Sequence, residues 1–211
     1  MSQYTTFEEK LNFLSHLMGL LFFLIACPYM LFKAIISDNP SNLAGLIIYS
    51  VGLIAVYATS SMYHYIKNAE FKLKFRTLDH MAIFLLIGGT YTPVVNKFIP
   101  NPLATIFLTI LWIILILGIF MKFFFTGRFK AFSVGLYVFL GCMVLFIIKP
   151  VVESMPHDIF IQILLGGLAY LVGVLFYVQK HRKYTHLIWH LFVLTASIFH
   201  FVAIYKTTFD I

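Results

Sequence analysis

The sequence predicts an all-α integral membrane protein with seven transmembrane helices, a cytoplasmic N-terminus and an extracytoplasmic C-terminus. Hydrophobic residues make up 61% of the 211 residues, and the mean hydropathy is +0.94. Only 11% of the residues are charged, whereas a soluble domain carries about 25%. At about 20 residues per spanning helix, we expect one seven-helix domain over residues 1–211 and no separate soluble domain.

Seven apolar runs supply the expected helices, because each can cross the roughly 30 Å hydrocarbon core of a bilayer at about 1.5 Å per residue. They cover residues 12–34, 43–66, 78–96, 103–125, 131–150, 158–179 and 186–205. The first run follows the acidic "FEEK" (7–10) and is too long for a signal peptide, so we expect it to be retained. Turn-forming or charged segments separate the runs: "SDNPSN" (37–42), "KNAEFKLKFR" (67–76), "NKFIPNP" (96–102), "FTGRFK" (125–130), "PVVESMPHD" (150–158) and "QKHRKYT" (179–185).

Lys and Arg are unequally divided between the two sides of the membrane. With a cytoplasmic N-terminus, eleven of the fifteen fall in cytoplasmic segments, and the remaining four are Lys33, Lys97, Lys149 and Lys206. The positive-inside rule therefore predicts this orientation. Attraction of the basic inner segments to anionic lipid headgroups also explains the isoelectric point near 9.4, so we expect no nucleic-acid partner.

Two histidines, His186 and His190, open the last run at its cytoplasmic end. At positions i and i+4 they lie about 40° apart on one helix face and about 6 Å apart along the axis. His64 reaches the same depth from the second run. Neutral imidazole is a common ligand of Zn²⁺, and three protein ligands leave a fourth position open. We therefore expect these three histidines to bind zinc, whereas His200, about 21 Å further along, belongs to the other leaflet.

Other polar residues enter the membrane at the same depth. Ser60 lies one turn from His64 on the same helix face, and Asp79 enters with the third run. The first run enters from this side with "EEKLNFLSH" (8–16), whose polar residues include Glu9, Asn12 and His16.

Structural explanations compete with a functional one for each of these residues. Asp79 could cap the N-terminus of the third helix, and Ser60 could hydrogen-bond to the preceding turn of its own helix. A single intramembrane histidine such as His200 is more often a hydrogen-bonded contact between helices. Three imidazoles at one depth on two helices fit zinc better than such contacts.

Four segments of the chain together resemble the hemolysin III family of bacterial membrane proteins, relatives of the progestin and adipoQ receptor (PAQR) family. They are "EEKLNFLSH" (8–16), "SSMYH" (60–64), "LDHMAIFLLIGGTYTP" (78–93) and "HLIWHLFVLTASIFHF" (186–201). The resemblance covers nearly the whole chain, with Ser-x3-His, Leu-Asp-His and His-x3-His on helices 2, 3 and 7. It implies a seven-helix fold with a cytoplasmic N-terminus and a zinc site near the inner face.

The resemblance also assigns residues to the site. It matches the family's site positions to Ser60, His64, Asp79, His186 and His190 and implies that Asp79 reaches the metal through water. A further family motif matches Glu9, Asn12 and His16, which we expect around the metal ligands. The long N-terminal cytoplasmic region of the eukaryotic receptors is missing, so a hormone receptor is not expected.

Two classes of function remain open. The first is an intramembrane zinc hydrolase of a lipid amide or ester, as ceramidase-like relatives suggest, with Asp79 as the base and Ser60 orienting the water or the substrate. The second is non-enzymatic: a regulator or sensor of membrane state with structural zinc, or a cytolysin. A cytolysin is the weaker alternative, because a seven-span protein has no evident soluble form. An open fourth position on the zinc favours the enzyme, and a closed site favours the sensor.

The expected partners are membrane lipids, with a lipid or fatty acid in a cavity near the zinc. The expected location is the bacterial plasma membrane, which the chain crosses several times.

Overall fold

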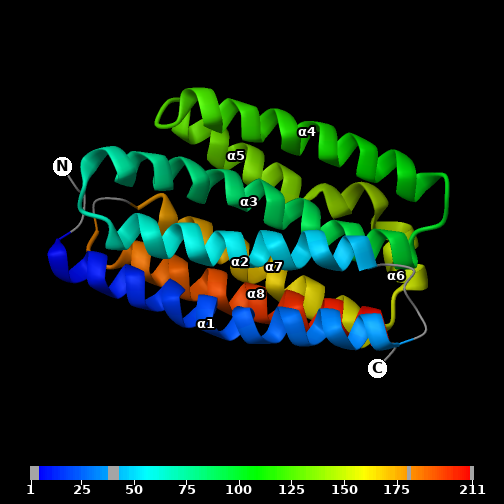
Figure 1. Ribbon diagram of the computed structural model, residues 1–211. Helices are drawn as coiled ribbons and strands as arrows, with labels where there is room; N and C mark the ends of the chain where they lie inside the picture. Colours follow the sequence, from blue (N-terminus) through cyan, green and yellow to red (C-terminus); the bar gives the residue numbers. More distant parts are fainter. Residues whose placement is uncertain (1–4, 38–42, 180–181, 210–211) are drawn as a thin grey trace.

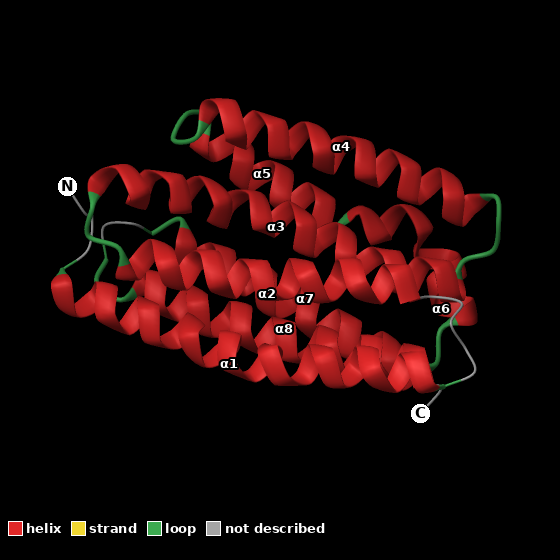
Figure 2. Ribbon diagram, viewed as in Figure 1, coloured by secondary structure: helices red, strands yellow, loops and turns green. Residues whose placement is uncertain are grey.

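The computed structural model describes residues 5–37, 43–179 and 182–209 as a bundle of long helices (Figure 1). Parts of two predicted breaks, 38–42 and 180–181, lie outside the described residues. The helices are α1 (Thr6–Ile36), α2 (Leu43–Tyr65), α3 (Ala69–Phe98), α4 (Leu103–Phe125), α5 (Lys130–Gly141), the 3₁₀ helix η2 (Met143–Ile147), α6 (Ile148–Ser154), α7 (His157–Tyr177) and α8 (Thr185–Phe209). The described residues contain no strand (Figure 2).

The predicted all-α fold with seven membrane-crossing helices is confirmed. In the part of the chain that the structure describes, seven helical stretches are long and apolar enough to cross a membrane, and the fifth combines α5, η2 and α6 over Lys130–Ser154. The start of α1 and the end of α8 lie at opposite ends of the bundle, as an odd number of crossings requires (Figure 1).

The fifth crossing is interrupted, although the sequence predicted one continuous helix over residues 131–150. The α-helix ends at Gly141, and Pro150 lacks the N–H group that a continuous helix would need. The Tyr91 hydroxyl of α3 donates to the Gly141 carbonyl oxygen at 2.8 Å and accepts from the Val144 N–H at 2.9 Å. Tyr91 therefore pairs backbone groups at the break that lipid could not satisfy.

The third helix begins nine residues earlier than predicted, at Ala69 instead of residue 78. Asn68 caps it, because its side-chain oxygen accepts from the backbone N–H groups of Glu70 and Phe71 at 3.0 and 3.2 Å. The charged segment 67–76, predicted as a loop, is therefore mostly the polar start of α3. Asp79 lies well inside the helix, so it is not the N-cap.

Four helices enclose the end of the bundle that carries the histidines. α1 contacts α2, α2 contacts α3, and α8 contacts both α1 and α3. Small residues bring α2 and α3 close together: a Cβ on Gly89 would lie 2.7 Å from the Tyr49 Cα, and one on Gly52 would lie 3.0 Å from the Leu86 Cα. Such close backbone approach is typical of helices packed in membranes.

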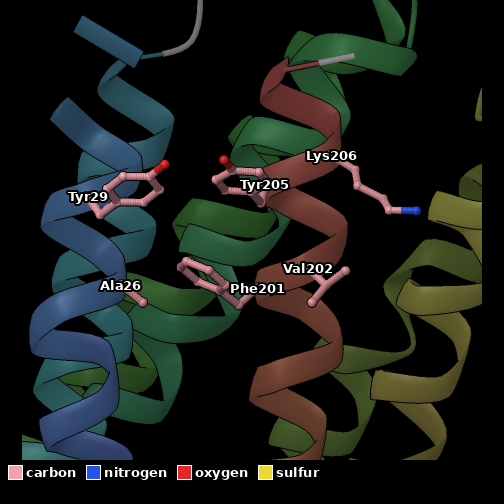
Figure 3. Close-up of a pocket in the computed structure, with 6 residues that line it drawn as sticks. All are labelled: Ala26, Tyr29, Phe201, Val202, Tyr205 and Lys206. Atoms are coloured by element: carbon pink, nitrogen blue, oxygen red, sulfur yellow. The ribbon is translucent and has the colours of Figure 1, made fainter. Parts of the chain in front are cut away.

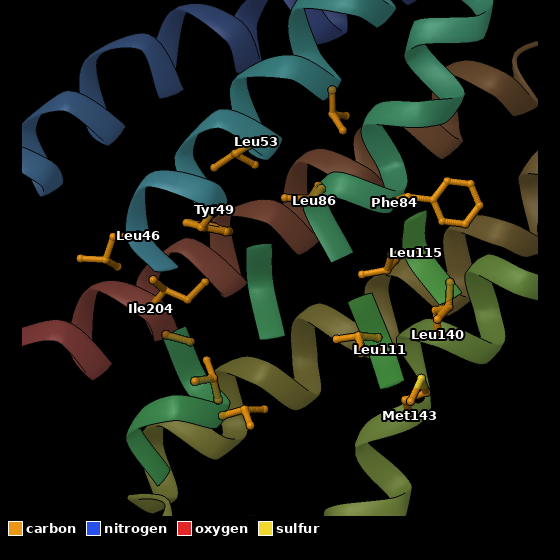
Figure 4. Close-up of a cluster of buried hydrophobic side chains, with 14 of the residues drawn as sticks. Leu46, Tyr49, Leu53, Phe84, Leu86, Leu111, Leu115, Leu140, Met143 and Ile204 are labelled. Carbon is orange, nitrogen blue, oxygen red and sulfur yellow. The ribbon is translucent and has the colours of Figure 1, made fainter. Parts of the chain in front are cut away.

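The apolar core runs through the bundle, and in the part among α2, α3, α4, α5 and α8 the side chains of Leu53, Phe84, Leu111 and Leu115 are fully buried (Figure 4). Large apolar side chains are also exposed along the outer faces of the bundle; Ile25 on α1, for example, is 75% exposed. An apolar exterior of this kind is expected for a surface that faces lipid.

Candidate metal centre

Three histidine side chains converge at one end of the bundle. His64 comes from the last turn of α2, and His186 and His190 come from the first two turns of α8. The Nε2 atom of His186 lies 3.2 Å from Nε2 of His64 and 3.1 Å from Nε2 of His190. His64 and His190 are buried, and His186 is partly exposed. The sequence predicted this convergence, and the structure brings the three residues together.

The hydrogen-bond partners of two of these rings determine which nitrogen carries the proton. Nδ1 of His64 lies 2.6 Å from a Glu9 carboxylate oxygen, and Nδ1 of His190 lies 3.1 Å from the Asn12 carbonyl oxygen. Both oxygens are acceptors, so each Nδ1 is the donor and each neutral ring presents an Nε2 lone pair.

This arrangement fits a metal ion. The three imidazoles offer ligand atoms that all lie within 4.8 Å of one another. An N–H on His186 Nε2 could donate along only one direction at a time, whereas one cation can accept lone pairs from all three rings. Hydrogen bonds from Nδ1 to a carboxylate and to a carbonyl are the usual outer contacts of metal-binding histidines.

Residues of α1 surround the histidine cluster, as the sequence predicted. Glu9 accepts from His64 through one oxygen and from the Lys72 ammonium through the other, at 2.9 Å. The His16 ring stacks on the His190 ring with their centroids 3.6 Å apart. Asn12 contributes its backbone carbonyl oxygen to His190, not its side chain.

Two buried side chains on this side of the cluster lack hydrogen-bond partners among the described residues. They are the Asn12 amide, at both its nitrogen and its oxygen, and both ring nitrogens of His16. Buried polar groups are normally paired with protein or with ordered water, because burial without a partner costs free energy. The α1 side of the cluster is therefore suited to water or to a polar group of a ligand.

Asp79 and Ser60 form a second polar group next to the cluster. Ser60 is buried one turn from His64 on α2, and its hydroxyl lies close to the Asp79 carboxylate on α3. The Asp79 carboxylate does not belong to the group of ligand atoms within 4.8 Å of one another. Asp79 is therefore near the cluster but is not in position to be a direct ligand.

Two contacts of the site were not predicted from the sequence. The Ser15 hydroxyl lies 3.0 Å from Nδ1 of His190 and donates to the Asn12 carbonyl oxygen at 2.8 Å. Lys72 was assigned to a loop, but it lies in α3 and binds Glu9. The only available signal for Ser15 was its position one residue before His16.

Local contacts at the helix ends position the ligands. Thr5 and Glu8 form a reciprocal capping box at the start of α1. The free oxygen of Glu8 accepts from the Tyr184 backbone N–H at 3.1 Å, and Tyr184 adopts a left-handed conformation with φ of 63°. This contact ties the start of α1 to the turn that precedes His186.

His200 lies away from the cluster, as its depth predicted. Its Nε2 is 3.1 Å from the Ile163 carbonyl oxygen of α7, and a Cβ on Gly166 would clash with the His200 ring. His200 therefore joins α7 to α8.

Comparisons with known proteins place the chain among membrane proteins of one family. The model of the family described as "Haemolysin-III related" matches residues 4–201. "Hemolysin-3" of Bacillus cereus is 34% identical over 90% of this chain and 87% of its own length. "Hemolysin-3 homolog" of Bacillus subtilis (strain 168) is 32% identical over 92% and 91%. The human "Monocyte to macrophage differentiation factor" is 31% identical over 75% of this chain and 68% of its own.

Proposed function

The chain belongs to the haemolysin III-related family, as its motifs predicted, and on this premise we propose that it is an intramembrane zinc hydrolase of a lipid amide or ester. The observation that carries the proposal is the convergence of three Nε2 atoms, at 3.1 and 3.2 Å, in a multi-pass membrane protein. The names of these relatives refer to no such activity, and the chemistry of the site supports the proposal.

In this proposal His64, His186 and His190 hold the metal. Zinc bound there supplies Lewis-acid chemistry, which makes a water molecule more acidic and polarises a carbonyl group. Glu9 holds the His64 ring with Nε2 toward the site, and Ser15 and the Asn12 carbonyl oxygen do the same for His190.

Asp79 acts as the general base and then as the general acid. Its carboxylate accepts a proton from the attacking water as the water oxygen bonds to the carbonyl carbon of the substrate. When the bond from that carbon to nitrogen or oxygen breaks, the same proton passes to the departing amine or alcohol. Ser60 supports this role, because its hydroxyl lies close to the Asp79 carboxylate and can orient it or the attacking water.

The location of the site favours a lipid substrate. The cluster joins two membrane-crossing helices at the end of the bundle, and His186 is partly exposed. A scissile amide or ester near a lipid headgroup lies at a comparable depth in the bilayer, and its acyl chains would remain among apolar surfaces. A lipid or fatty acid beside the metal is part of this proposal.

A structural role for zinc is the second candidate. One observation favours it: His64 lies on α2 and His186 and His190 lie on α8, so a metal ion would cross-link helices far apart in the chain. In that case the protein would be a regulator or sensor of membrane state. A cytolytic role, which the relatives' name "Hemolysin-3" suggests, is less well supported, because seven membrane-crossing helices leave no evident soluble form.

Lipid hydrolysis by the reconstituted protein distinguishes the two roles. Zinc-loaded protein in bilayers is incubated with a panel of ceramides, phospholipids and acylglycerols, and released fatty acid is measured by mass spectrometry. The hydrolase proposal predicts release that stops when zinc is chelated and returns when zinc is restored. If no lipid in the panel is cleaved while zinc still raises the unfolding temperature, the structural role is correct.

A further inference from the structure

A cavity of about 340 Å³ lies between α1 and α8, at the end of the bundle opposite the histidine cluster (Figure 3). It is lined almost wholly by apolar atoms, from Ala26 and Tyr29 of α1 and from Phe201, Val202, Tyr205 and Lys206 of α8. In the figure, the Tyr29 and Tyr205 rings extend toward each other from the two helices. The cavity is open on one side, where the bundle surface is apolar.

The cavity is separate from the histidine site. The Phe201 ring packs against the rings of Phe23 and Phe22, with centroids 5.8 and 6.5 Å apart, between the cavity and the histidines. Ten residues of α1, about 15 Å of helix, separate Ala26 from His16. A molecule in the cavity would therefore belong to the other leaflet.

A cation lies beside the cavity, in contact with one of its lining residues. Lys33 follows Tyr29 by one turn on the same face of α1, and its ammonium donates to the Tyr205 hydroxyl at 2.7 Å. Among the described residues no carboxylate pairs with Lys33. The neighbouring Lys206, in contrast, points away from α1 and binds Asp158 at 2.6 Å (Figure 3).

The Lys33 ammonium can donate three hydrogen bonds and uses one for Tyr205. The Tyr29 side chain, one turn away, is 58% exposed, so its hydroxyl is also accessible. The cavity therefore combines an apolar interior with two kinds of nearby hydrogen-bond donor and a positive charge that no carboxylate of the described residues neutralises. This combination complements a molecule with a hydrocarbon chain and a negative headgroup.

We propose that this cavity binds an anionic phospholipid of the leaflet opposite the histidine cluster. One acyl chain lies between Tyr29, Phe201 and Tyr205, and the phosphate accepts hydrogen bonds from Lys33 and from the Tyr29 hydroxyl. A zwitterionic lipid binds less well, because its own ammonium group offsets the attraction to Lys33. Lysine and tyrosine are common at any membrane interface, but Tyr29 lines a cavity and Lys33 contacts a residue that lines it.

The test compares lipid retention by native mass spectrometry. Protein purified in detergent receives equal amounts of phosphatidylglycerol and phosphatidylcholine with the same oleoyl chains. Wild type is expected to retain phosphatidylglycerol in preference to phosphatidylcholine. Lys33→Gln should reduce this preference about fivefold, since one lysine near a membrane surface contributes that much to anionic-lipid binding. The matched control is Lys149→Gln, an exposed lysine at the same end of the bundle, which should leave the preference unchanged.

A second variant tests the cavity without changing any charge. Ala26→Phe places a ring in the cavity and should abolish retention of both lipids, while circular dichroism and gel filtration confirm the fold. If Lys33→Gln fails to fold, the headgroup preference of wild type and the loss of retention in Ala26→Phe together decide the question. Any of three results overturns the proposal. Wild type could retain the two lipids equally, Lys149→Gln could lose as much of the preference for phosphatidylglycerol as Lys33→Gln does, or Ala26→Phe could retain both lipids fully.

Discussion

The Glu9 carboxylate on α1 accepts a hydrogen bond from Nδ1 of His64 on α2 at 2.6 Å. Its second oxygen binds the Lys72 ammonium on α3 at 2.9 Å. One carboxylate therefore joins three helices beside the histidine cluster and directs Nε2 of His64 toward the other two rings. A charged acceptor also raises the basicity of the imidazole that donates to it.

Glu9→Gln is expected to weaken zinc binding by about 10- to 100-fold, which is the usual effect of losing such an outer contact. The amide keeps the size of the side chain but not its charge. Zinc affinity is measured by competition with a chelator of known affinity. Glu70→Gln is the control, because Glu70 is an exposed acid at the start of α3 that binds Lys74 instead. An affinity of the Glu9 variant equal to wild type would show that this contact does not support the metal.

Asp79→Asn should abolish hydrolysis while zinc content and fold remain as in wild type. The amide preserves the shape of the side chain and its contact with Ser60 but cannot accept the proton from water. Fatty-acid release and zinc content are measured on the same preparations. Asp158→Asn, at the other end of the bundle, is the control and should retain activity. Turnover that survives in Asp79→Asn rules out this residue as the base.

Gly89→Ala should destabilise the bundle by about 1 to 3 kcal/mol, because the added Cβ would lie 2.7 Å from the Tyr49 Cα and force α2 away from α3. Gly135→Ala is the matched control, since a Cβ there meets no atom within 4 Å. Unfolding in detergent by heat or denaturant gives the two stabilities. Equal stability of the two variants would mean that the α2–α3 approach tolerates a methyl group.

The N-terminus and the turn before α3 are predicted to be cytoplasmic, because eleven of the fifteen basic residues lie on that side. Lys67→Cys and Lys149→Cys are introduced separately after Cys27 and Cys142 are replaced by Ser. A membrane-impermeant maleimide should label position 149 in intact cells and position 67 only after lysis. The reverse pattern would place the histidine cluster at the outer face.

Hydropathy and helical spacing were sufficient to predict most of the fold and the histidine cluster. The thickness of the bilayer sets the minimum length of an apolar run that can cross it, so long apolar runs locate the membrane crossings well. Spacing along a helix is regular, so His186 and His190 could be placed on one face and His64 at the same depth.

Hydropathy fails where the structure depends on local or long-range contacts. It placed the start of the third run after the charged residues, at residue 78. The helix α3 in fact begins at Ala69, after its Asn68 cap, and its first turns are polar and lie outside the apolar run. It also missed the break at Gly141, because the compensating hydroxyl comes from Tyr91, fifty residues away. Ser15 could not be assigned, since its contact with His190 depends on how α1 packs against α8.

The metal content of a purified histidine variant tests the central claim most directly. Wild type is expected to hold one zinc per chain, and the His186→Ala, His190→Ala double variant should hold none, since one remaining imidazole is too few ligands. It should also unfold at a lower temperature, because metal binding contributes to folding free energy. His157→Ala, an exposed histidine at the start of α7, is the control and should keep its zinc. Full zinc content in the double variant would contradict the assignment of the site.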